Sequence, residues 1–360
     1  MEEYFTNTKI LSGPGSVKAL RELGSKALFM VADPYFEKNG TARRLAELSG
    51  AERTQIFSQI TPDPTLEQVA QATVTVQEFK PDTVVALGGG SAMDCAKAMV
   101  YFSGLSVTFV AIPTTSGSGS EVTDFAVLTQ GGVKHPLVDE KLCPQIAILD
   151  GELLGQLPKT LIADTGFDVL AHALEAYVAA GAGAITDALA KEAFCTAVTQ
   201  LPLSYTGVIA ARQKMHEAAT MAGMAFTRAG LGLCHAMSHA LGGLLHLPHG
   251  RLNAILLPAV IGTNSGAVQA KYAVMARSAG FAGSADTVAV RNLKNGLIRL
   301  RKELQLPATL AEAGVQPGKV WQSAGKIAEA VLADPCCKSN PVQVEDYMIR
   351  RILEEVTGRV

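Results

Sequence analysis

The pattern of apolar and polar residues along the chain changes near position 158. Before it, short apolar, β-branched runs alternate with stretches of helical spacing, and the runs predict strands at residues 26–32, 53–60, 82–90 and 107–113. Helices are predicted at 64–80 and 91–104, and a segment of possible hairpin character spans 124–150, with its turn at Gly131 and Gly132. Strands that alternate with helices are typical of a parallel sheet.

After Pro158 the strand pattern stops. Ala- and Leu-rich segments at 161–180, 185–201 and 211–226 have helical spacing, and the helical pattern continues toward the end of the chain. We therefore expect an α/β domain with a parallel sheet at 1–157 and an all-α domain at 158–360. An active site would lie in the cleft between two such domains.

Three consecutive glycines, Gly88, Gly89 and Gly90, stand between a predicted strand and a predicted helix. Glycines there let backbone amides approach a phosphate, and the helix N-terminus adds its positive dipole end. Ser91 is expected to be the N-cap, with Asp94 completing a capping box in which Asp replaces Glu. The two polar residues could do no more than cap the helix, but the glycines favour pyrophosphate binding. The pattern is not G-x-G-x-x-G.

Asp33 ends the first predicted strand, where a carboxylate can accept hydrogen bonds from a ribose and repel a 2′-phosphate. It precedes the glycines, whereas in the usual dinucleotide fingerprint the acid follows them. Thr114 and Thr115 follow the fourth strand in a Ser/Gly-rich loop. Their hydroxyl groups suit phosphate or nicotinamide contacts, although a solvated loop has the same composition.

Four of the seven histidines lie within fifteen positions of the second half: His235, His239, His246 and His249. A buried imidazole needs a partner for each ring nitrogen, and a metal ion is one such partner. His235 and His239 are spaced i, i+4, and so are Asp168 and His172 in another apolar segment, which places each pair on one helical face. Such a pair is often only a surface contact. One carboxylate with imidazoles suits Fe(II) or Zn(II).

The motifs "ALGGGSAMDCAKAM", "IPTTSGSGSEVT", "DVLAHALEAY" and "GLGLCHAMSHALGGLLHLPHGRLNAILLP" resemble the successive signatures of the iron-containing (group III) alcohol dehydrogenase family. The resemblance covers essentially the whole chain, and the last motif is highly specific. In detail the sequence is most similar to the propanol and ethanol dehydrogenases of diol- and ethanolamine-degrading microcompartments.

The resemblance implies a metal ion, Fe(II) or Zn(II), and the cofactor NAD(H). The metal ligands it implies are Asp168, His172, His235 and His249. His239 would lie beside the nicotinamide and carry a proton, whereas His246 matches no family ligand and is either a structural residue or one near the cleft mouth. The dinucleotide residues it implies are Asp33, Gly88, Gly89, Gly90, Ser91, Asp94, Thr114, Thr115 and Lys134. Phe125 and Phe226 would line the substrate pocket, unless they are ordinary core residues.

Composition excludes several other classes. With 48% hydrophobic residues, 18% charged residues and a net charge of -2, the chain is globular and lacks the basic surface expected for nucleic acid or anionic membranes. The first ten residues do not resemble a signal peptide, and no apolar run approaches the roughly 18 to 20 residues of a membrane span. We expect a cytoplasmic protein, within a microcompartment if the finer resemblance holds, and a homodimer or higher homo-oligomer.

The six cysteines form no C-x-x-C pair, which favours reduced thiols, and none is expected to bind metal. The adjacent Cys336 and Cys337 are interpreted as small buried side chains rather than a redox pair.

Two other functions stay open on the sequence. A glycerol dehydrogenase, glycerol-phosphate dehydrogenase or dehydroquinate synthase-like lyase would use the same scaffold, but a charged substrate needs basic residues near the metal. The only Lys or Arg residues between positions 215 and 255 are Arg228 and Arg251. A non-catalytic protein with a structural metal is the second alternative, and the lack of cysteine ligands argues against it.

Overall fold

The computed structural model describes residues 4, 6–131 and 133–358. The chain divides into two compact units: one ends at Gln156, and the other contains Tyr4 and the residues from Leu157 onward. Among the described residues, no helix is both long enough and apolar enough to cross a membrane.

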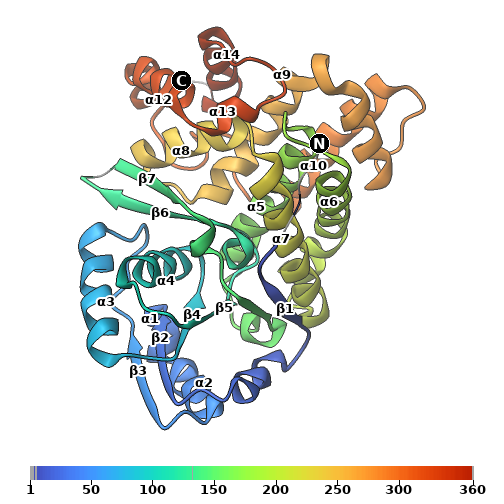
Figure 1. Ribbon diagram of the computed structural model, residues 1–360. Helices are drawn as coiled ribbons and strands as arrows, with labels where there is room; N and C mark the ends of the chain where they lie inside the picture. The colour runs from blue at the N-terminus through green and yellow to red at the C-terminus, as the bar shows by residue number, and fades with distance from the viewer. Residues whose placement is uncertain (1–3, 5, 132, 359–360) are drawn as a thin grey trace. The chain divides into compact units, whose positions relative to one another are not determined.

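The first unit is built on a parallel sheet of six strands, ordered β1-β8-β5-β4-β2-β3 (Figure 1). The predicted α/β fold with a parallel sheet is therefore confirmed. In sheet order the strands are β1 (Lys9–Ser12), β8 (Ile146–Leu149), β5 (Thr108–Pro113), β4 (Thr83–Gly88), β2 (Ala27–Ala32) and β3 (Arg53–Phe57). The helices are α1 (Pro34–Lys38), α2 (Thr41–Ser49), α3 (Leu66–Phe79) and α4 (Gly90–Ser103), with short 3-10 helices at Ser16–Leu23, Ser120–Val122, Glu140–Leu142 and Gly151–Leu154.

Each face of this sheet has its own core. Strand β2 is buried throughout, and its side chains alternate: Phe29 and Val31 pack with α3 and α4, whereas Leu28 and Met30 pack with α2 on the other face. Both faces of a parallel sheet are covered, so its strands are continuous apolar runs. That is why β2, β4 and β5 could be found from the sequence. The fourth predicted strand, β3, lies at the edge of the sheet and is partly exposed, so it is not such a run.

The segment 124–150 contains a hairpin and one further element. Strands β6 (Phe125–Gln130) and β7 (Val133–Val138) pair antiparallel as expected, and Gly132 of the predicted turn lies outside the described residues. Residues 146–149 are not part of the hairpin. They form β8, which lies between β1 and β5 in the main sheet. The sequence did not separate β8 from the hairpin, because an apolar run of four residues is too short to be assigned by periodicity alone.

The second unit is helical. Its helices are α5 (Lys159–Val178), α6 (Ala184–Tyr205), α7 (Ile209–Ala229), α8 (Leu233–Leu245), α9 (His249–Ser278), α10 (Asp286–Glu303), α11 (Pro317–Gln322), α12 (Ala324–Ala333), α13 (Cys336–Ser339) and α14 (Asp346–Thr357). No strand occurs in the described part of this unit, which confirms the all-α prediction. Helix α5 is buried from Gly166 to Val178 and packs against α6, α7 and α9.

The start of α9 approaches α5 unusually closely. A Cβ atom at Gly250 would lie 1.9 Å from the carbonyl oxygen of Asp164 and 3.3 Å from the Cβ of Asp168. Arg251 fixes the same contact by donating from Nε and Nη2 to the two carboxylate oxygens of Asp164, at 3.1 and 2.9 Å. The absence of a side chain at Gly250 therefore allows its neighbour His249 to lie beside α5.

Candidate functional site

The glycine turn of the first unit joins β4 to α4. A Cβ at Gly88 would lie 2.5 Å from the Cβ of Ala92 and 3.1 Å from that of Asp33, so only glycine fits between the strand and the helix. The N-cap of α4 is Gly89, in extended conformation, and no described side chain caps the helix. Its first backbone N–H groups are thus left for another acceptor, and a phosphate is the acceptor that such a turn suits.

The structure explains the unusual sequence order of Asp33. Strands β2 and β4 are neighbours, with Ala32 paired to Leu87. Asp33 directly follows β2 and Gly88 is the last residue of β4, so the two lie side by side although 55 residues separate them. The Oδ1 atom of Asp33 caps α1 by accepting the backbone N–H of Tyr35 at 2.9 Å. Its second oxygen is not used in this cap.

Two expectations about the start of α4 are wrong. Ser91 is not the N-cap, because the helix begins at Gly90, and Asp94 makes no capping box. Asp94 instead accepts the backbone N–H of Val127 in β6, and burial raises its pKa to about 6, against the opposing charge of Lys97. Asp94 therefore faces β6 rather than the glycine turn.

Lys97, one turn after Asp94, is fully buried and holds the same strand. Its Nζ donates to the carbonyl oxygens of Thr123 and Phe125, at 2.8 and 2.9 Å, and to the Thr123 hydroxyl at 2.8 Å. The Phe125 ring lies 5.8 Å from the same ammonium group. Asp94 and Lys97 thus attach the hairpin to the helix that carries the glycine turn.

Three further predicted nucleotide residues lie around the turn. Thr114 is buried and donates its N–H to the carbonyl oxygen of Gly88 at 2.9 Å, and the Oγ1 of Thr115 is 3.3 Å from a Cβ built at Gly89. Lys134 in β7 forms an exposed ion pair with Asp63 at 2.7 Å, and the N–H of Asp63 reaches the hydroxyl of Ser91 at 3.4 Å. The structure therefore brings this predicted set together.

In the helical unit, Asp168, His235 and His249 present their ligand atoms to one another. One atom from each lies within 4.8 Å of the other two. The Oδ1 of Asp168 is 3.8 Å from Nε2 of His235 and 3.7 Å from Nε2 of His249. The three residues come from α5, α8 and the first position of α9, so three separate helices position the cluster.

His172 lies on the same face of α5, one turn after Asp168, and its ring stacks on that of His235. The two ring centroids are 4.4 Å apart, with 20° between the planes. Phe226 of α7 stacks on His172 at the same centroid distance, with a 23° angle. Phe226 is buried, and because it stacks on His172 its ring packs directly on a predicted metal ligand.

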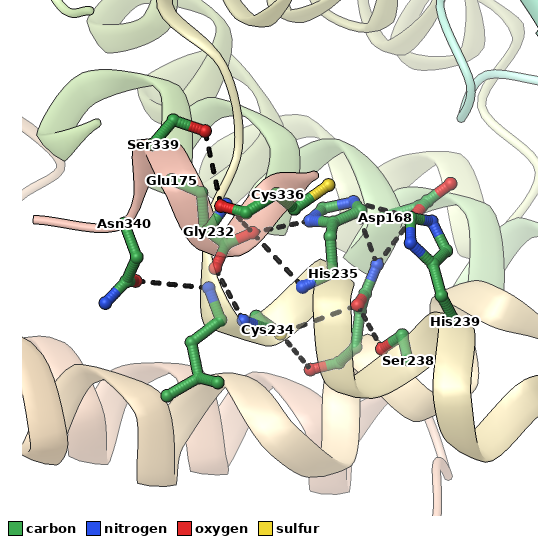
Figure 2. Close-up of polar contacts among 12 residues, drawn as sticks. Asp168, Glu175, Gly232, Cys234, His235, Ser238, His239, Cys336, Ser339 and Asn340 are labelled. Atoms are coloured by element: carbon green, nitrogen blue, oxygen red, sulfur yellow. Dashed lines mark hydrogen bonds and ion pairs between the residues drawn. The ribbon is translucent and has the colours of Figure 1, made fainter. Parts of the chain in front are cut away.

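Glu175 holds His235 in place, one further turn along α5. Its Oε2 lies 2.6 Å from Nδ1 of His235, and its two oxygens accept the backbone N–H groups of Gly232, Cys234 and His235 at 2.7 to 3.3 Å (Figure 2). A single carboxylate therefore caps α8 and sets the tautomer of a ring on it. With the proton on Nδ1, the lone pair of Nε2 points to the cluster.

Asn253, on the second turn of α9, bridges the cluster. Its Nδ2 donates to Oδ1 of Asp168 at 2.7 Å and lies 3.3 Å from Nε2 of His235. Its Oδ1 accepts the hydroxyl of Ser238 at 2.6 Å, which fixes the orientation of the amide. Asn253 thus orients the carboxylate that the cluster shares.

The side chain of His239 is accessible, with 39% of it exposed, compared with 33% for His249 and 1% for His235. Its ring stacks on that of His249, at a centroid distance of 5.1 Å. Its Nδ1 lies 2.8 Å from Oδ2 of Asp334. Burial alone would raise the pKa of Asp334, but the hydrogen bond and charge of His239 outweigh it and lower that pKa.

His246 has a structural explanation. It is the C-cap of α8, with φ of 56°, and its N–H bonds the carbonyl oxygen of Gly242. A left-handed residue that closes a helix is a common C-cap. The four histidines that are clustered in the sequence therefore have different places in the structure: His235 and His249 face Asp168, His239 contacts Asp334, and His246 closes α8.

The cluster suits a metal ion by its chemistry. Burial, with the neighbouring histidines adding to it, holds the pKa of His235 well below its ordinary value, and burial does the same for His249, so both rings are neutral at pH 7 and can donate lone pairs. One carboxylate and neutral imidazoles fit Fe(II) or Zn(II), and a set without thiolates is typical of catalytic rather than structural sites.

A parallel α/β unit with an uncapped glycine turn, and a helical unit with a carboxylate–imidazole cluster, define a metal-dependent oxidoreductase. Residues 7–151 match the family model described as iron-containing alcohol dehydrogenase, and residues 162–357 match the C-terminal model of the same family. The chain belongs to the iron-containing alcohol dehydrogenase family.

Individual relatives match this chain over nearly its full length. The chain is 40% identical to the 1-propanol dehydrogenase PduQ of Citrobacter freundii, over 99% of this chain and 100% of that protein. The iron-containing alcohol dehydrogenase of Thermococcus thioreducens has a similar structure, with a TM-score of 0.91 and 32% identity over 98% of each chain. So does the sulfoacetaldehyde reductase of Bifidobacterium kashiwanohense, solved with NAD+, with a TM-score of 0.89 and 27% identity over 98% of each chain.

Sequence reasoning missed three residues that hold the site. Glu175 was detectable, because Asp168, His172 and Glu175 follow the i, i+4, i+7 spacing of one helical face. Asn253 lies four residues after His249, so the two share one helical face, but this single spacing is a weaker indication than three residues in a row. Asp334 is 95 residues from His239, and no spacing connects them.

Proposed function

We propose that this protein is an NAD(H)- and iron-dependent alcohol dehydrogenase that interconverts short-chain primary alcohols and aldehydes, such as 1-propanol and propanal. The observation that carries the proposal is the cluster of Asp168, His235 and His249, whose ligand atoms converge without a thiolate. When bound, the metal supplies a Lewis acid for the substrate oxygen, and NAD(H) supplies or accepts the hydride.

Asp168, His172, His235 and His249 would hold the metal ion. Glu175 accepts a hydrogen bond from the proton-bearing Nδ1 of His235, so that Nε2 stays unprotonated and can bind the ion. Asn253 donates to the Asp168 carboxylate and fixes its orientation toward the two histidines. The stacking of Phe226 on His172 excludes water from one face of that ring. These neighbours restrict the rotation of the ligands, so little rearrangement is needed when the ion binds.

The nucleotide would be held by the first unit. The uncapped N-terminus of α4, with Gly88, Gly89, Gly90 and Ser91, suits the pyrophosphate. Asp33 has one carboxylate oxygen outside its cap for the adenosine ribose, and Thr114, Thr115 and Lys134 lie around the same turn. Asp94, which faces β6, would act by positioning the hairpin and with it Phe125.

His239 would move the proton. Asp334 accepts from Nδ1 of His239, which leaves Nε2 as the atom that can take a proton from the alcohol during oxidation or donate one to the substrate oxygen during aldehyde reduction. The ring is exposed enough to pass that proton to water. An imidazole held by a carboxylate in this way is a common proton carrier.

The structure weakens the alternative of a phosphorylated or carboxylated substrate. Arg251, one of two basic residues in the region of the histidines, is committed to both oxygens of Asp164. An anionic substrate would need such a group free beside the metal. Phe125 and Phe226, which we propose line the substrate pocket, offer no hydrogen-bond partner to a hydroxyl group. Unsubstituted aldehydes are therefore favoured over glyceraldehyde and dihydroxyacetone, because a stranded hydroxyl costs about 1 to 3 kcal/mol.

The proposal is tested by following nicotinamide absorbance with a panel of aldehydes, with and without added Fe(II). Propanal should be reduced with a higher kcat/KM than glyceraldehyde, lactaldehyde or dihydroxyacetone. It should exceed acetaldehyde a few-fold, since each buried methylene contributes roughly 0.8 kcal/mol. Activity that does not depend on metal, or efficient use of glycerol over 1-propanol, would contradict it.

Two finer features of the proposal rest on the sequence resemblance alone. They are assembly as a homodimer or higher homo-oligomer, which sedimentation velocity tests, and residence in a bacterial microcompartment, which co-purification with shell particles tests.

A further inference from the structure

A second group of potential ligands lies beside the cluster already described. His239 of α8, Asp334 at the end of α12 and Cys336 at the start of α13 each offer one atom, and the three atoms lie within 4.8 Å of one another. All three residues are partly buried. His239 is the only one of them that the predicted active site uses.

The carboxylate of Asp334 gathers the other two residues. Its Oδ2 lies 2.8 Å from Nδ1 of His239, its Oδ1 accepts the backbone N–H of Cys336 at 2.8 Å, and the Cys336 thiol hydrogen-bonds the same carboxylate. Figure 2 shows the Cys336 sulphur on the side of α13 that faces the His235 ring. The three donor groups therefore converge on one point.

Nitrogen, oxygen and sulphur donors in one group suit Zn²⁺. Zinc binds imidazole, carboxylate and thiolate at about 2.0 to 2.3 Å, so ligand atoms of a tetrahedral site lie roughly 3.3 to 3.8 Å apart. Atoms that are already within 4.8 Å need only small side-chain rotations to reach that spacing. Three protein ligands leave the fourth position to water.

We propose that His239, Asp334 and Cys336 form a second, inhibitory site for Zn²⁺, distinct from the metal centre of Asp168, His172, His235 and His249. On binding, the Cys336 thiol loses its proton to solvent and the sulphur bonds the ion. The Nδ1 of His239 also becomes a ligand, so its proton moves to Nε2. With Nε2 protonated, His239 can no longer accept a proton there. The inhibitory effect, unlike the binding itself, rests on the proposed proton role of His239.

The neighbouring cysteine provides a matched control. The Sγ of Cys337 contacts the carbonyl oxygen of Val331 at 2.9 Å, so this thiol points to α12 and not to Asp334. Cys336→Ser and Cys337→Ser make the same chemical change one residue apart. Only the first removes a ligand of the proposed site.

Cobalt absorbance tests the binding directly on the full-length, metal-loaded enzyme. The proposed ligands of the first centre include no cysteine, so a thiolate-to-Co²⁺ charge-transfer band would report the second site alone. We expect added Co²⁺ to give this band in the wild-type protein and in Cys337→Ser, and Zn²⁺ to displace it. We expect no band in Cys336→Ser. A wild-type protein without the band, or a Cys336→Ser variant that keeps it, would overturn the proposal.

Inhibition by Zn²⁺ tests the consequence. Loss of an outer hydrogen-bond partner alone costs roughly 10- to 100-fold in metal affinity, so loss of a direct ligand should cost at least that much. The Zn²⁺ concentration that halves the turnover of each variant should therefore rise at least about ten-fold in Cys336→Ser and stay unchanged in Cys337→Ser. If Zn²⁺ displaces the cobalt band without slowing turnover, the site stands and the inhibitory role, with the proton role of His239, is wrong.

Discussion

The Oε2 of Glu175 lies 2.6 Å from the Nδ1 of His235, inside a set of contacts in which the same carboxylate caps helix α8. Burial raises the pKa of Glu175 to about 7, against the lowering effect of the three backbone N–H groups that it accepts. The position of α8 and the tautomer of a proposed metal ligand therefore depend on one buried side chain.

We expect Glu175→Gln to weaken metal binding more than it weakens the fold. The amide keeps one acceptor oxygen for the α8 backbone, but it cannot serve as the carboxylate that fixes the proton on Nδ1 of His235. Metal affinity should fall roughly 10- to 100-fold, as measured by competition with a chelator. Glu192→Gln, at an exposed position of α6, is the control and should leave the affinity unchanged. Equal affinities in the two variants would contradict the role of Glu175.

Removal of a proposed ligand should abolish metal retention and turnover together. Asp168→Ala deletes the carboxylate that lies between His235 and His249, and His249→Ala deletes the ligand on α9. The helical unit has its own core, so circular dichroism should stay close to that of the wild type. Metal content per chain and kcat are the two measurements. A variant that loses its metal and keeps full activity would refute the proposed mechanism.

The sequence predicted those parts of the site that follow a helical or strand period. Asp168 with His172, and His235 with His239, share i, i+4 spacing, and the buried strands β2 and β4 are continuous apolar runs. The Ser91 cap was wrong because Gly89, with no side chain, takes the extended N-cap conformation one residue earlier than expected. Cys336 and Cys337 are half-buried rather than buried, because they lie at the short helix α13.

Contacts between distant elements could not be predicted in this way. Asp33 lies beside Gly88 because of the strand order, and Asp334 lies beside His239 because of the packing of α12 and α13 on α8. A period in the sequence says which residues share a face, but not which other element covers that face.

Gly88→Ala should impair nucleotide binding. The added methyl group would lie 2.5 Å from the Cβ of Ala92 and must push α4 away from β4, which moves the N–H groups proposed to bind pyrophosphate. We expect the Kd for NADH, measured by fluorescence, to rise at least about ten-fold, which corresponds to about 1.4 kcal/mol. Gly325→Ala, in α12 with open space around the added atom, is the control. Unchanged NADH affinity in Gly88→Ala would remove the turn from the nucleotide site.

Asp33 should set the preference for NADH over NADPH. Asp33→Asn keeps an N-cap for α1, since Asn is as good a cap as Asp, but removes the charge that would repel a 2′-phosphate. Two like charges about 4 Å apart cost roughly 1 kcal/mol even in water, so the NADH/NADPH ratio of kcat/KM should fall several-fold. A wild-type enzyme that uses both cofactors equally would show that Asp33 is misplaced.

Phe226 should affect both metal retention and substrate range, because its ring stacks on His172. Phe226→Ala leaves a cavity next to that ring, and truncation of a buried Phe costs about 3 to 5 kcal/mol of stability. We expect this variant to release its metal faster and to accept longer or branched aldehydes relative to propanal. Phe226→Leu fills most of the volume and should retain the metal nearly as well as the wild type, although it lacks a planar ring. The half-time of metal release to a chelator and the ratio of kcat/KM for hexanal and propanal separate the two effects. If Phe226→Ala matches the wild type in both measurements, the residue is ordinary core and lines no pocket.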